Sequence, residues 1–289
     1  MSDVALAPPR RRRSRRKVAR RLALNLTGLF VFVVMVFPVY WMVATSFKPG
    51  NDVLSYSPHW VPTSPTLANF RDAIGRPYFW DNVKNSLIVV GAVVLIAVVL
   101  AFLAAVALAK FRFHGRRAFV VVIFAVQMVP LAALIIPLYI LLSRANQVDK
   151  LSGVVVTYLT FVLPFCVWTL RGFMLGVPRD LEEAAMVDGS TRFGAFVRIL
   201  LPLVAPGLVA TSIFAFIQVW NEFIIAYVLL QSQDKQTLPV WLASFTTLRG
   251  TEWGPLMAAA TLTALPVVFF FVLVHRRIAF GLTAGAVKS

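Results

Sequence analysis

The sequence predicts an all-helical integral membrane protein with six transmembrane helices, and its composition and hydropathy carry that prediction. Of its 289 residues, 59% are hydrophobic and only 14% are charged, and the mean hydropathy is +0.80. An average soluble domain has about a quarter of its residues charged. A soluble core of this size could not bury so much apolar surface, so a bilayer is the expected surrounding.

Apolar runs of roughly 18 to 25 residues predict the spans, because about 20 such residues cross the hydrocarbon layer. The six runs are Leu22–Phe47, Ser86–Ala109, Ala118–Ser143, Leu151–Leu175, Val204–Gln231 and Leu256–Val274. Five runs contain proline, which tends to kink a helix: Pro38, Pro130 with Pro137, Pro164, Pro206 and Pro266. Ordinary membrane-helix composition and a transporter with bent helices around a cavity both fit these prolines.

The first apolar run resembles a signal peptide in one respect, because a basic stretch precedes it. The run is too long for that, and Ser46–Pro49 offers no small-residue cleavage site. We therefore expect a retained first helix.

Basic residues outside the runs predict the orientation. Segments 1–21, 110–117, 171–198 and 275–289 contain 20 of the 28 Lys and Arg residues, and the intervening outer segments contain 8. The positive-inside rule places both termini in the cytoplasm. The expected organisation is a basic tail (1–21), a membrane domain (22–274) with an outer loop (48–85) and a long cytoplasmic loop (176–203), and a C-terminal cytoplasmic tail (275–289).

Motifs for independent chemistry are absent from the sequence. It has no phosphate-binding Gly-rich loop, no His-Glu-x-x-His and no nucleophile elbow, and its histidines lack metal-ligand spacing. Cys166 is the single cysteine, and Glu222 is the one ionisable residue clearly inside a run. We expect no catalytic site, no metal site and no nucleic-acid partner. A self-contained carrier or channel for a small polar solute remains the main alternative, although such carriers usually show several intramembrane charges.

The loop 176–203 predicts a small helical element. Pro178 suits a first helical position, the acids Asp180, Glu182 and Glu183 suit the positive end of the helix dipole, and Gly189 suits a helix stop. Ser190 or Thr191 can cap a second helix. Acids and arginines nearly balance in this segment, which favours docking on a protein over contact with an anionic lipid surface. A purely structural loop is the other reading.

A longer motif lies in the same loop. The segment Glu183-Ala184-Ala185-Met186-Val187-Asp188-Gly189, nine residues and then Ile199-Leu200-Leu201-Pro202 read E-A-A-x3-G-x9-I-x-L-P. This pattern resembles the signature of permeases of bacterial binding-protein-dependent ABC importers. Segments 66–70, 127–130, 136–139, 218–223 and 281–288 are similar to the carbohydrate-uptake branch, which includes the smaller maltose permease.

The resemblance implies a type I importer permease in the bacterial plasma membrane. Its expected partners are a second homologous permease, a dimer of ATP-binding cassette ATPases and an extracytoplasmic sugar-binding protein, with ATP and Mg²⁺ held by the ATPases and no cofactor on this chain. The loop 176–203, called the coupling loop below, would dock on an ATPase. The implied coupling residues are Glu183, Ala184, Ala185, Asp188, Gly189 and Pro202, and the implied ATPase-contacting tail residues are Gly281, Thr283 and Gly285.

Three residues are candidates for the translocation path or a gate: Gln127, Asn221 and Glu222. Asn221 and Glu222 suit hydrogen bonds to sugar hydroxyls, and they equally suit a contact with the partner permease or the binding protein. The Arg10–Lys17 run lies outside the resemblance. We interpret it as an orientation anchor, with contact to lipid headgroups as the alternative.

Overall fold

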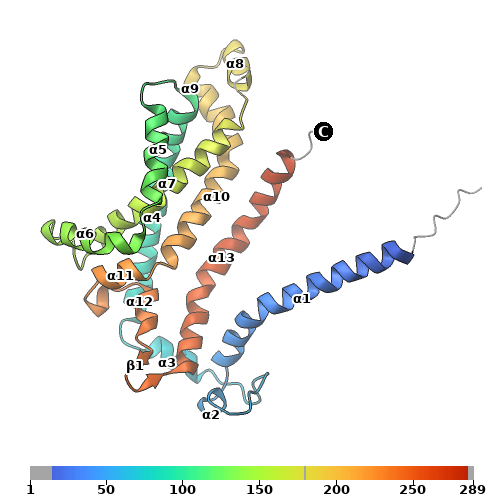
Figure 1. Cartoon of the computed structure of the whole chain (residues 1–289), viewed down its shortest axis with the longest axis vertical. Coiled ribbons are helices and arrows are strands. Elements are labelled where there is room, and N and C mark those ends of the chain that lie inside the picture. The colour runs from blue at the N-terminus through green and yellow to red at the C-terminus, as the bar shows by residue number, and fades with distance from the viewer. Residues whose placement is uncertain (1–14, 179, 286–289) are drawn as a thin grey trace, which may run out of the picture.

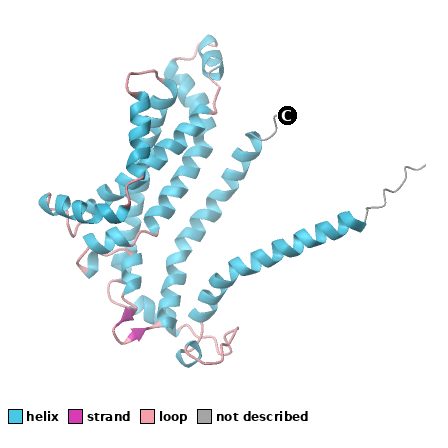
Figure 2. Cartoon of the chain, in the orientation of Figure 1, coloured by secondary structure: helices cyan, strands magenta, loops and turns pink. Residues whose placement is uncertain are grey.

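The chain is described by a computed structural model for residues 15–178 and 180–285, with side-chain burial for 19–178 and 180–273. The Arg10–Lys17 run and the tail residues Gly281, Thr283 and Gly285 lie outside the residues whose side chains are described. Within the described part, nearly all regular structure is helical (Figures 1 and 2). The predicted helical membrane fold is confirmed.

The elements follow one another from an N-terminal helix to a C-terminal one. They are α1 (Arg15–Ser46), α2 (Gly50–Val53), α3 (Ala68–Gly75), α4 (Phe79–Lys110), α5 (Arg116–Gln127), α6 (Leu131–Arg144), α7 (Leu151–Leu175), α8 (Asp180–Val187), α9 (Arg192–Ala195), the π-helical turn η1 (Phe196–Leu200), α10 (Leu201–Trp220), α11 (Ile224–Leu229), the 3₁₀ turn η2 (Gln233–Lys235), α12 (Leu238–Ala243), β1 (Thr246–Thr247), β2 (Gly250–Thr251) and α13 (Trp253–Gly285).

Two of the six predicted spans differ from a single straight helix. Five helices are long and apolar enough to cross a bilayer, and α5 with α6 forms a sixth span bent by 97°. The expected run 118–143 is therefore broken just before Pro130, where residues 128–130 separate the two helices. The fifth span is Arg192–Trp220 rather than 204–231. The hydropathy pattern did not locate the C-terminal end of the fifth span, because α11, which follows the interruption, is also apolar.

The core lies where α4 packs against α7 and α10, and α4 with α7 forms the most extensive helix contact. Every fourth residue of α4 from Val93 to Ala105 is fully buried, and three of these four are alanines (Ala97, Ala101, Ala105). Small side chains let membrane helices approach closely. Cys166 of α7 is also fully buried.

The two ends of this bundle carry different elements (Figure 1). One end carries α8 and α9 of the coupling loop. The other, which we call the hairpin end, carries α3, α12 and the antiparallel pair β1–β2, in which Thr246 faces Thr251. The bundle helices connect these two ends.

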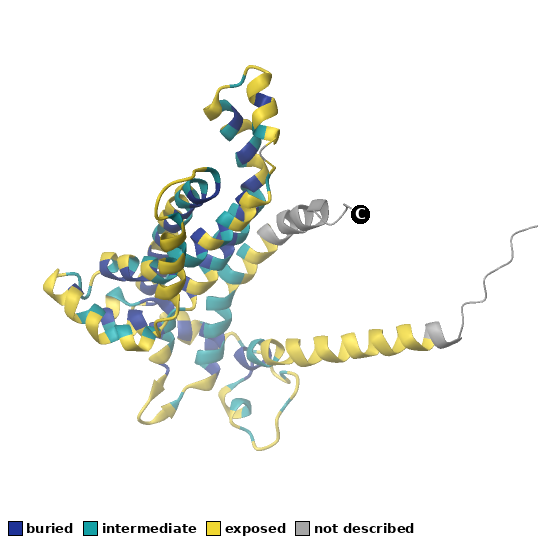
Figure 3. Cartoon of the chain, turned by 45° about the horizontal axis from the view of Figure 1, so that its top comes forward, coloured by how far each residue is buried: buried dark blue, intermediate teal, exposed yellow. Residues whose placement is uncertain are grey.

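Helix α1 diverges from the bundle and touches it mainly through α13 (Figures 1 and 3). No residue of its most apolar stretch is buried. Such exposure is expected of a helix in lipid, because lipid tails are as apolar as the side chains they surround.

Candidate functional site: the coupling loop and the breaks in the spans

The coupling loop begins with the short helix α8, which ends in the way its sequence predicts. Asp180, Glu182 and Glu183 occupy its first turn, where backbone N–H groups lack helical partners and favour acids. After α8, the Ser190 N–H donates to the Ala185 carbonyl at 2.9 Å and the Gly189 N–H donates to the Met186 carbonyl. Gly189 has a φ of +88°, a left-handed conformation that glycine adopts without steric cost.

The second part of the loop leads directly into the fifth span. Thr191 caps α9, because its Oγ1 accepts a hydrogen bond from the Gly194 N–H at 3.1 Å. The π-helical turn η1 then joins α9 to α10, and Pro202 follows in the first turn of α10. π-helical turns interrupt regular α-helix and are frequent at functional sites.

The predicted coupling residues are placed on both sides of the loop. Glu183, Ala184, Asp188 and Gly189 are exposed at the end of the molecule, and Pro202 is exposed at the start of α10. Ala185 is buried and packs inside the loop. It therefore does not share one open face with Ala184 in this arrangement.

Large apolar side chains project from the same loop. Val187 is 87% exposed and Phe193 is 76% exposed. Charged and small residues surround them, so the loop presents apolar side chains within a largely polar knob. Exposed apolar groups rimmed by polar ones are typical of protein contact surfaces.

The coupling loop is held to the end of α4 by contacts that the sequence did not reveal. Lys110, in the last turn of α4, forms an ion pair with Glu182 of α8. The rings of Phe102 in α4 and Phe196 in η1 lie 5.7 Å apart. A cleft of about 330 Å³ separates the two elements and includes Met186 and Arg192 in its lining. The loop thus rests on α4 as well as leading into α10.

Gln127 lies at the break in the third span. It is the last residue of α5 and is exposed, directly before the 97° bend. The three residues of the bend are exposed as well. Gln127 is thus placed where the backbone leaves a straight helical path.

Asn221 and Glu222 lie at the break in the fifth span, and Glu222 holds that break together. Its carboxylate accepts hydrogen bonds from the N–H groups of Ile225 at 2.9 Å and Ala226 at 3.2 Å, at the start of α11. It also accepts a 2.5 Å hydrogen bond from the Tyr158 hydroxyl of α7. Asn221 Nδ2 donates back to the Ile217 carbonyl of α10. The carboxylate is therefore engaged with backbone and with a neighbouring span.

Asp149, between α6 and α7, holds the segment that follows α11. It accepts hydrogen bonds from the N–H groups of Gln231 and Ser232, from the Ser232 hydroxyl and from Lys235 Nζ at 2.8 Å. Burial would raise the pKa of Asp149, but the hydrogen bonds from Lys235 and Ser232 outweigh it and lower that pKa well below its usual value. The chain after α11 is thereby anchored by an ionised carboxylate.

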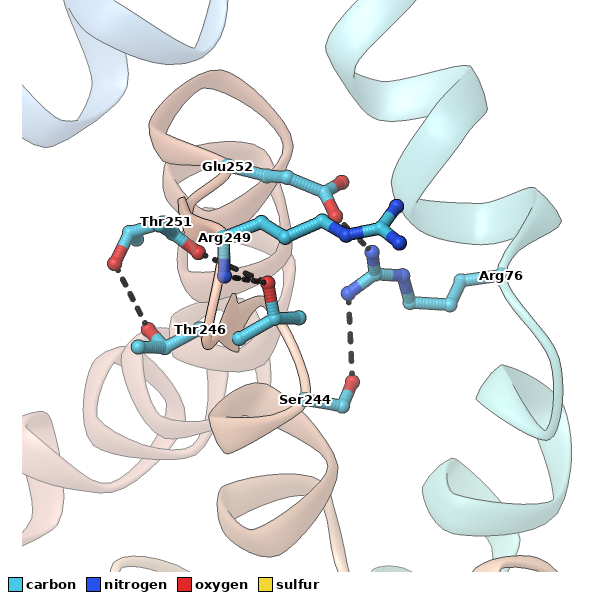
Figure 4. A network of polar contacts seen from close by, with 8 residues as sticks. Arg76, Ser244, Thr246, Arg249, Thr251 and Glu252 are labelled. Atoms are coloured by element: carbon cyan, nitrogen blue, oxygen red, sulfur yellow. Dashed lines mark hydrogen bonds and ion pairs between the residues drawn. The ribbon is translucent and has the colours of Figure 1, made fainter.

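The hairpin end has its own network (Figure 4). Arg76, which follows α3, forms a 2.8 Å ion pair with Glu252 and lies over the Phe245 ring at 3.9 Å. It also reaches Ser244, while the hydroxyls of Thr246 and Thr251 meet across the hairpin. The hairpin is thus attached to the segment that joins α3 to α4.

Comparison with known proteins assigns a family to this arrangement. Residues 97–283 match the family described as binding-protein-dependent transport system inner membrane component. The diacetylchitobiose uptake system permease protein DasC of Streptomyces coelicolor is 45% identical, covering 95% of this chain and 100% of DasC. The trehalose transport system permease protein SugB of Mycobacterium tuberculosis is 35% identical, covering 87% of this chain and 92% of SugB.

A solved structure supports the same fold. A chain from the crystal structure of a bacterial ABC transporter involved in the import of the acidic polysaccharide alginate matches with a TM-score of 0.77 at 20% identity, covering 91% of this chain and 98% of that chain. Of the two classes that the sequence left open, the self-contained carrier is therefore set aside. This chain belongs to the family of inner membrane components of binding-protein-dependent transport systems, as a multi-span permease subunit.

Proposed function

We propose that this chain is one of the two permeases of an ATP-driven sugar importer and that it forms half of the translocation path. The observation that carries the proposal is the coupling loop, which holds Glu183 and Ala184 exposed on a short helix ended by Gly189. A knob of this kind suits a cleft on an ATPase, where alanine permits close approach and Glu183 can pair with a basic group.

The partners follow from this assignment. We expect a second permease, a pair of ATPases that hold ATP and Mg²⁺, and a sugar-binding protein outside the membrane, with no cofactor on this chain. The ATPase would contact the coupling loop and the binding protein would contact the hairpin end, which fits cytoplasmic termini. The tail residues Gly281, Thr283 and Gly285 would reach the ATPases.

The proposed substrate is a neutral oligosaccharide. The names of DasC and SugB state uptake of diacetylchitobiose and transport of trehalose, so disaccharides are the first candidates. Gln127 and Asn221, each exposed at a break in a span, are the side chains we assign to the path. Glu222 is assigned to holding the break, because its oxygens already accept hydrogen bonds from α11 and Tyr158.

The test is purification of the tagged chain from its native membrane in mild detergent, followed by identification of the proteins that accompany it. We expect a second permease with the same loop motif, an ATPase with a phosphate-binding loop and a sugar-binding protein. The binding protein is then titrated with N,N′-diacetylchitobiose, trehalose and maltose. Recovery of the chain alone after cross-linking would contradict the proposal, and binding of none of the three sugars would contradict its disaccharide part.

A further inference from the structure

Helix α4 runs without interruption from one end of the bundle to the other (Figure 1). It has 32 residues, contains no proline and at 1.5 Å per residue spans about 48 Å. Sharp kinks in helices occur at proline, at π-helical turns or where a side chain breaks the hydrogen-bond ladder. Because α4 is a regular helix throughout, a push at one end reaches the other end with little loss in bending.

The cytoplasmic end of α4, in the orientation proposed above, is joined to the coupling loop. The ion pair between Lys110 and Glu182 is largely removed from solvent, with side-chain exposures of 14% and 23%. Such a charge-assisted contact is stronger and more directional than an exposed pair. The ring contact between Phe102 and Phe196 adds a second point of attachment.

The opposite end of α4 is joined to the segment that leads into the hairpin. Asn85 Nδ2 donates to the carbonyls of Asp234 at 2.8 Å and Gln236 at 3.1 Å, and the Leu238 N–H donates to Ser86 Oγ at 2.7 Å. Asn85 and Ser86 are both buried. These bonds tie η2, the residue after it and the first residue of α12 to α4.

The other route from the coupling loop is less direct. The loop continues through the π-helical turn η1 into α10, and α10 ends at the interrupted segment 221–223. Both features are places where a helix bends. We therefore expect a displacement of the loop to be transmitted to the hairpin end more completely through α4 than through η1 and α10.

We propose that α4 is the strut through which the coupling loop and the hairpin end move together, and that Lys110 and Glu182 are the positioning residues at its inner end. The inference rests on the proposed function, since it requires an ATPase on the loop and a binding protein on the hairpin end. It adds a transmission route inside this chain and assigns Lys110 and Glu182 to it.

The experiment uses the complete importer in lipid nanodiscs and measures ATP hydrolysis with and without the purified binding protein. Lys110→Glu and Glu182→Lys, each alone, should lower the stimulation by the binding protein about tenfold, the effect expected of losing one charge-assisted hydrogen bond. The double variant K110E/E182K restores opposite charges and should recover stimulation to within about threefold of the wild type. Such rescue is not expected if either residue only fills space.

The matched control is Arg112→Glu. Arg112 is exposed two residues beyond Lys110, so its reversal changes the loop charge equally without touching the ion pair. It should leave stimulation within about twofold of the wild type. Lys110→Met and Glu182→Gln, which keep the side-chain volume, replace the reversals if these prevent assembly.

The outcomes separate the two proposals. If the wild-type chain does not assemble with an ATPase, the proposed function fails. If it assembles and is stimulated, two results overturn the strut: single variants that keep full stimulation, or a charge-swapped double variant that assembles and stays unstimulated. An equal loss in Arg112→Glu would likewise assign the effect to net charge and overturn the role of the ion pair.

Discussion

Helix α4 and the fifth span have similar lengths and are both apolar enough to cross a bilayer, but their architectures are opposite. The candidate span Phe79–Lys110 has 32 residues and Arg192–Trp220 has 29. The first is one regular helix, whereas the second begins through the π-helical turn η1 and is followed by the interrupted segment 221–223. Composition alone does not separate a rigid helix from a jointed one.

The difference between them comes from polar side chains more than from prolines. Pro164 and Pro266 lie inside α7 and α13 without ending them. The break at 221–223 contains no proline. The N–H groups of Ile225 and Ala226, at the start of α11 just after the break, donate to the Glu222 carboxylate. A helix in a membrane ends where another group satisfies the freed backbone.

The largest expected effect is that of Glu222→Ala, which removes the acceptor from the joint of the fifth span. The Tyr158 hydroxyl and two N–H groups of α11 lose their partner, so we expect the free energy of unfolding to fall by about 3 kcal/mol. Thermal unfolding of the purified chain in detergent measures the loss.

Tyr158→Phe is the control for that prediction, because it removes one donor and leaves both backbone bonds, at a cost of about 1 kcal/mol. Glu222→Gln should fall between the two in stability. If Glu222→Ala unfolds at the wild-type temperature, the carboxylate does not stabilise the break at 221–223. The proposed cause of the difference between α4 and the fifth span would then be wrong.

Ala101→Leu tests whether close packing holds the uninterrupted helix α4 in place. Ala101 is fully buried on the face of α4 that contains Val93, Ala97 and Ala105. A larger side chain there should separate α4 from its neighbours and cost about 2 kcal/mol. Leu103, which is 59% exposed, provides the control, and Leu103→Ala should change the unfolding temperature little. Equal effects of both variants would show that close packing does not hold α4 in place.

Gly189→Val acts just before the fifth span begins. A valine at a φ of +88° is strained by about 1–2 kcal/mol, so the turn between α8 and α9 should open. We expect sugar uptake by membrane vesicles to fall about tenfold while membrane insertion is kept. Gly28→Val is the control, because a side chain meets nothing within 4 Å at either position, whereas of the two only Gly189 has a positive φ. Normal uptake by Gly189→Val would remove this turn from coupling.

Asp149→Asn should give the smallest effect, about 1 kcal/mol at pH 7. The folded state lowers the pKa of Asp149, so its stabilising contribution is complete above the ordinary value of about 4 and is lost as the pH falls below it. The gap between wild type and variant, measured by thermal unfolding, should therefore narrow from pH 7 to pH 3. An unchanged gap would mean that the charge of Asp149 adds nothing.

Local sequence patterns predicted the coupling loop well. The acids of α8, the cap at Thr191 and the left-handed turn at Gly189 each depend on neighbours within a few residues, so the sequence contains what decides them. The motif did not show, however, that packing inside the loop buries Ala185, one of the implied coupling residues.

Contacts between distant residues escaped prediction. Lys110 and Glu182 are 72 positions apart, and a hydropathy pattern contains no information about which distant residues are in contact. Glu222 had a local signal: an acid placed three and four residues before the N–H groups of a new helix is a pattern of helix starts. The apolar run on both sides concealed it, which is why the fifth span was predicted to continue to residue 231.

The fully buried position of Cys166 has a practical consequence. It is the single cysteine of the chain and lies inside α7 with no exposed surface. Thiol reagents need a reachable sulfur, so a cysteine introduced at Val187 or Leu248, which are 87% and 109% exposed, would be the main target for maleimide labels. Fluorophores or spin labels at these two sites would report the distance between the ends of the permease without prior removal of the native thiol.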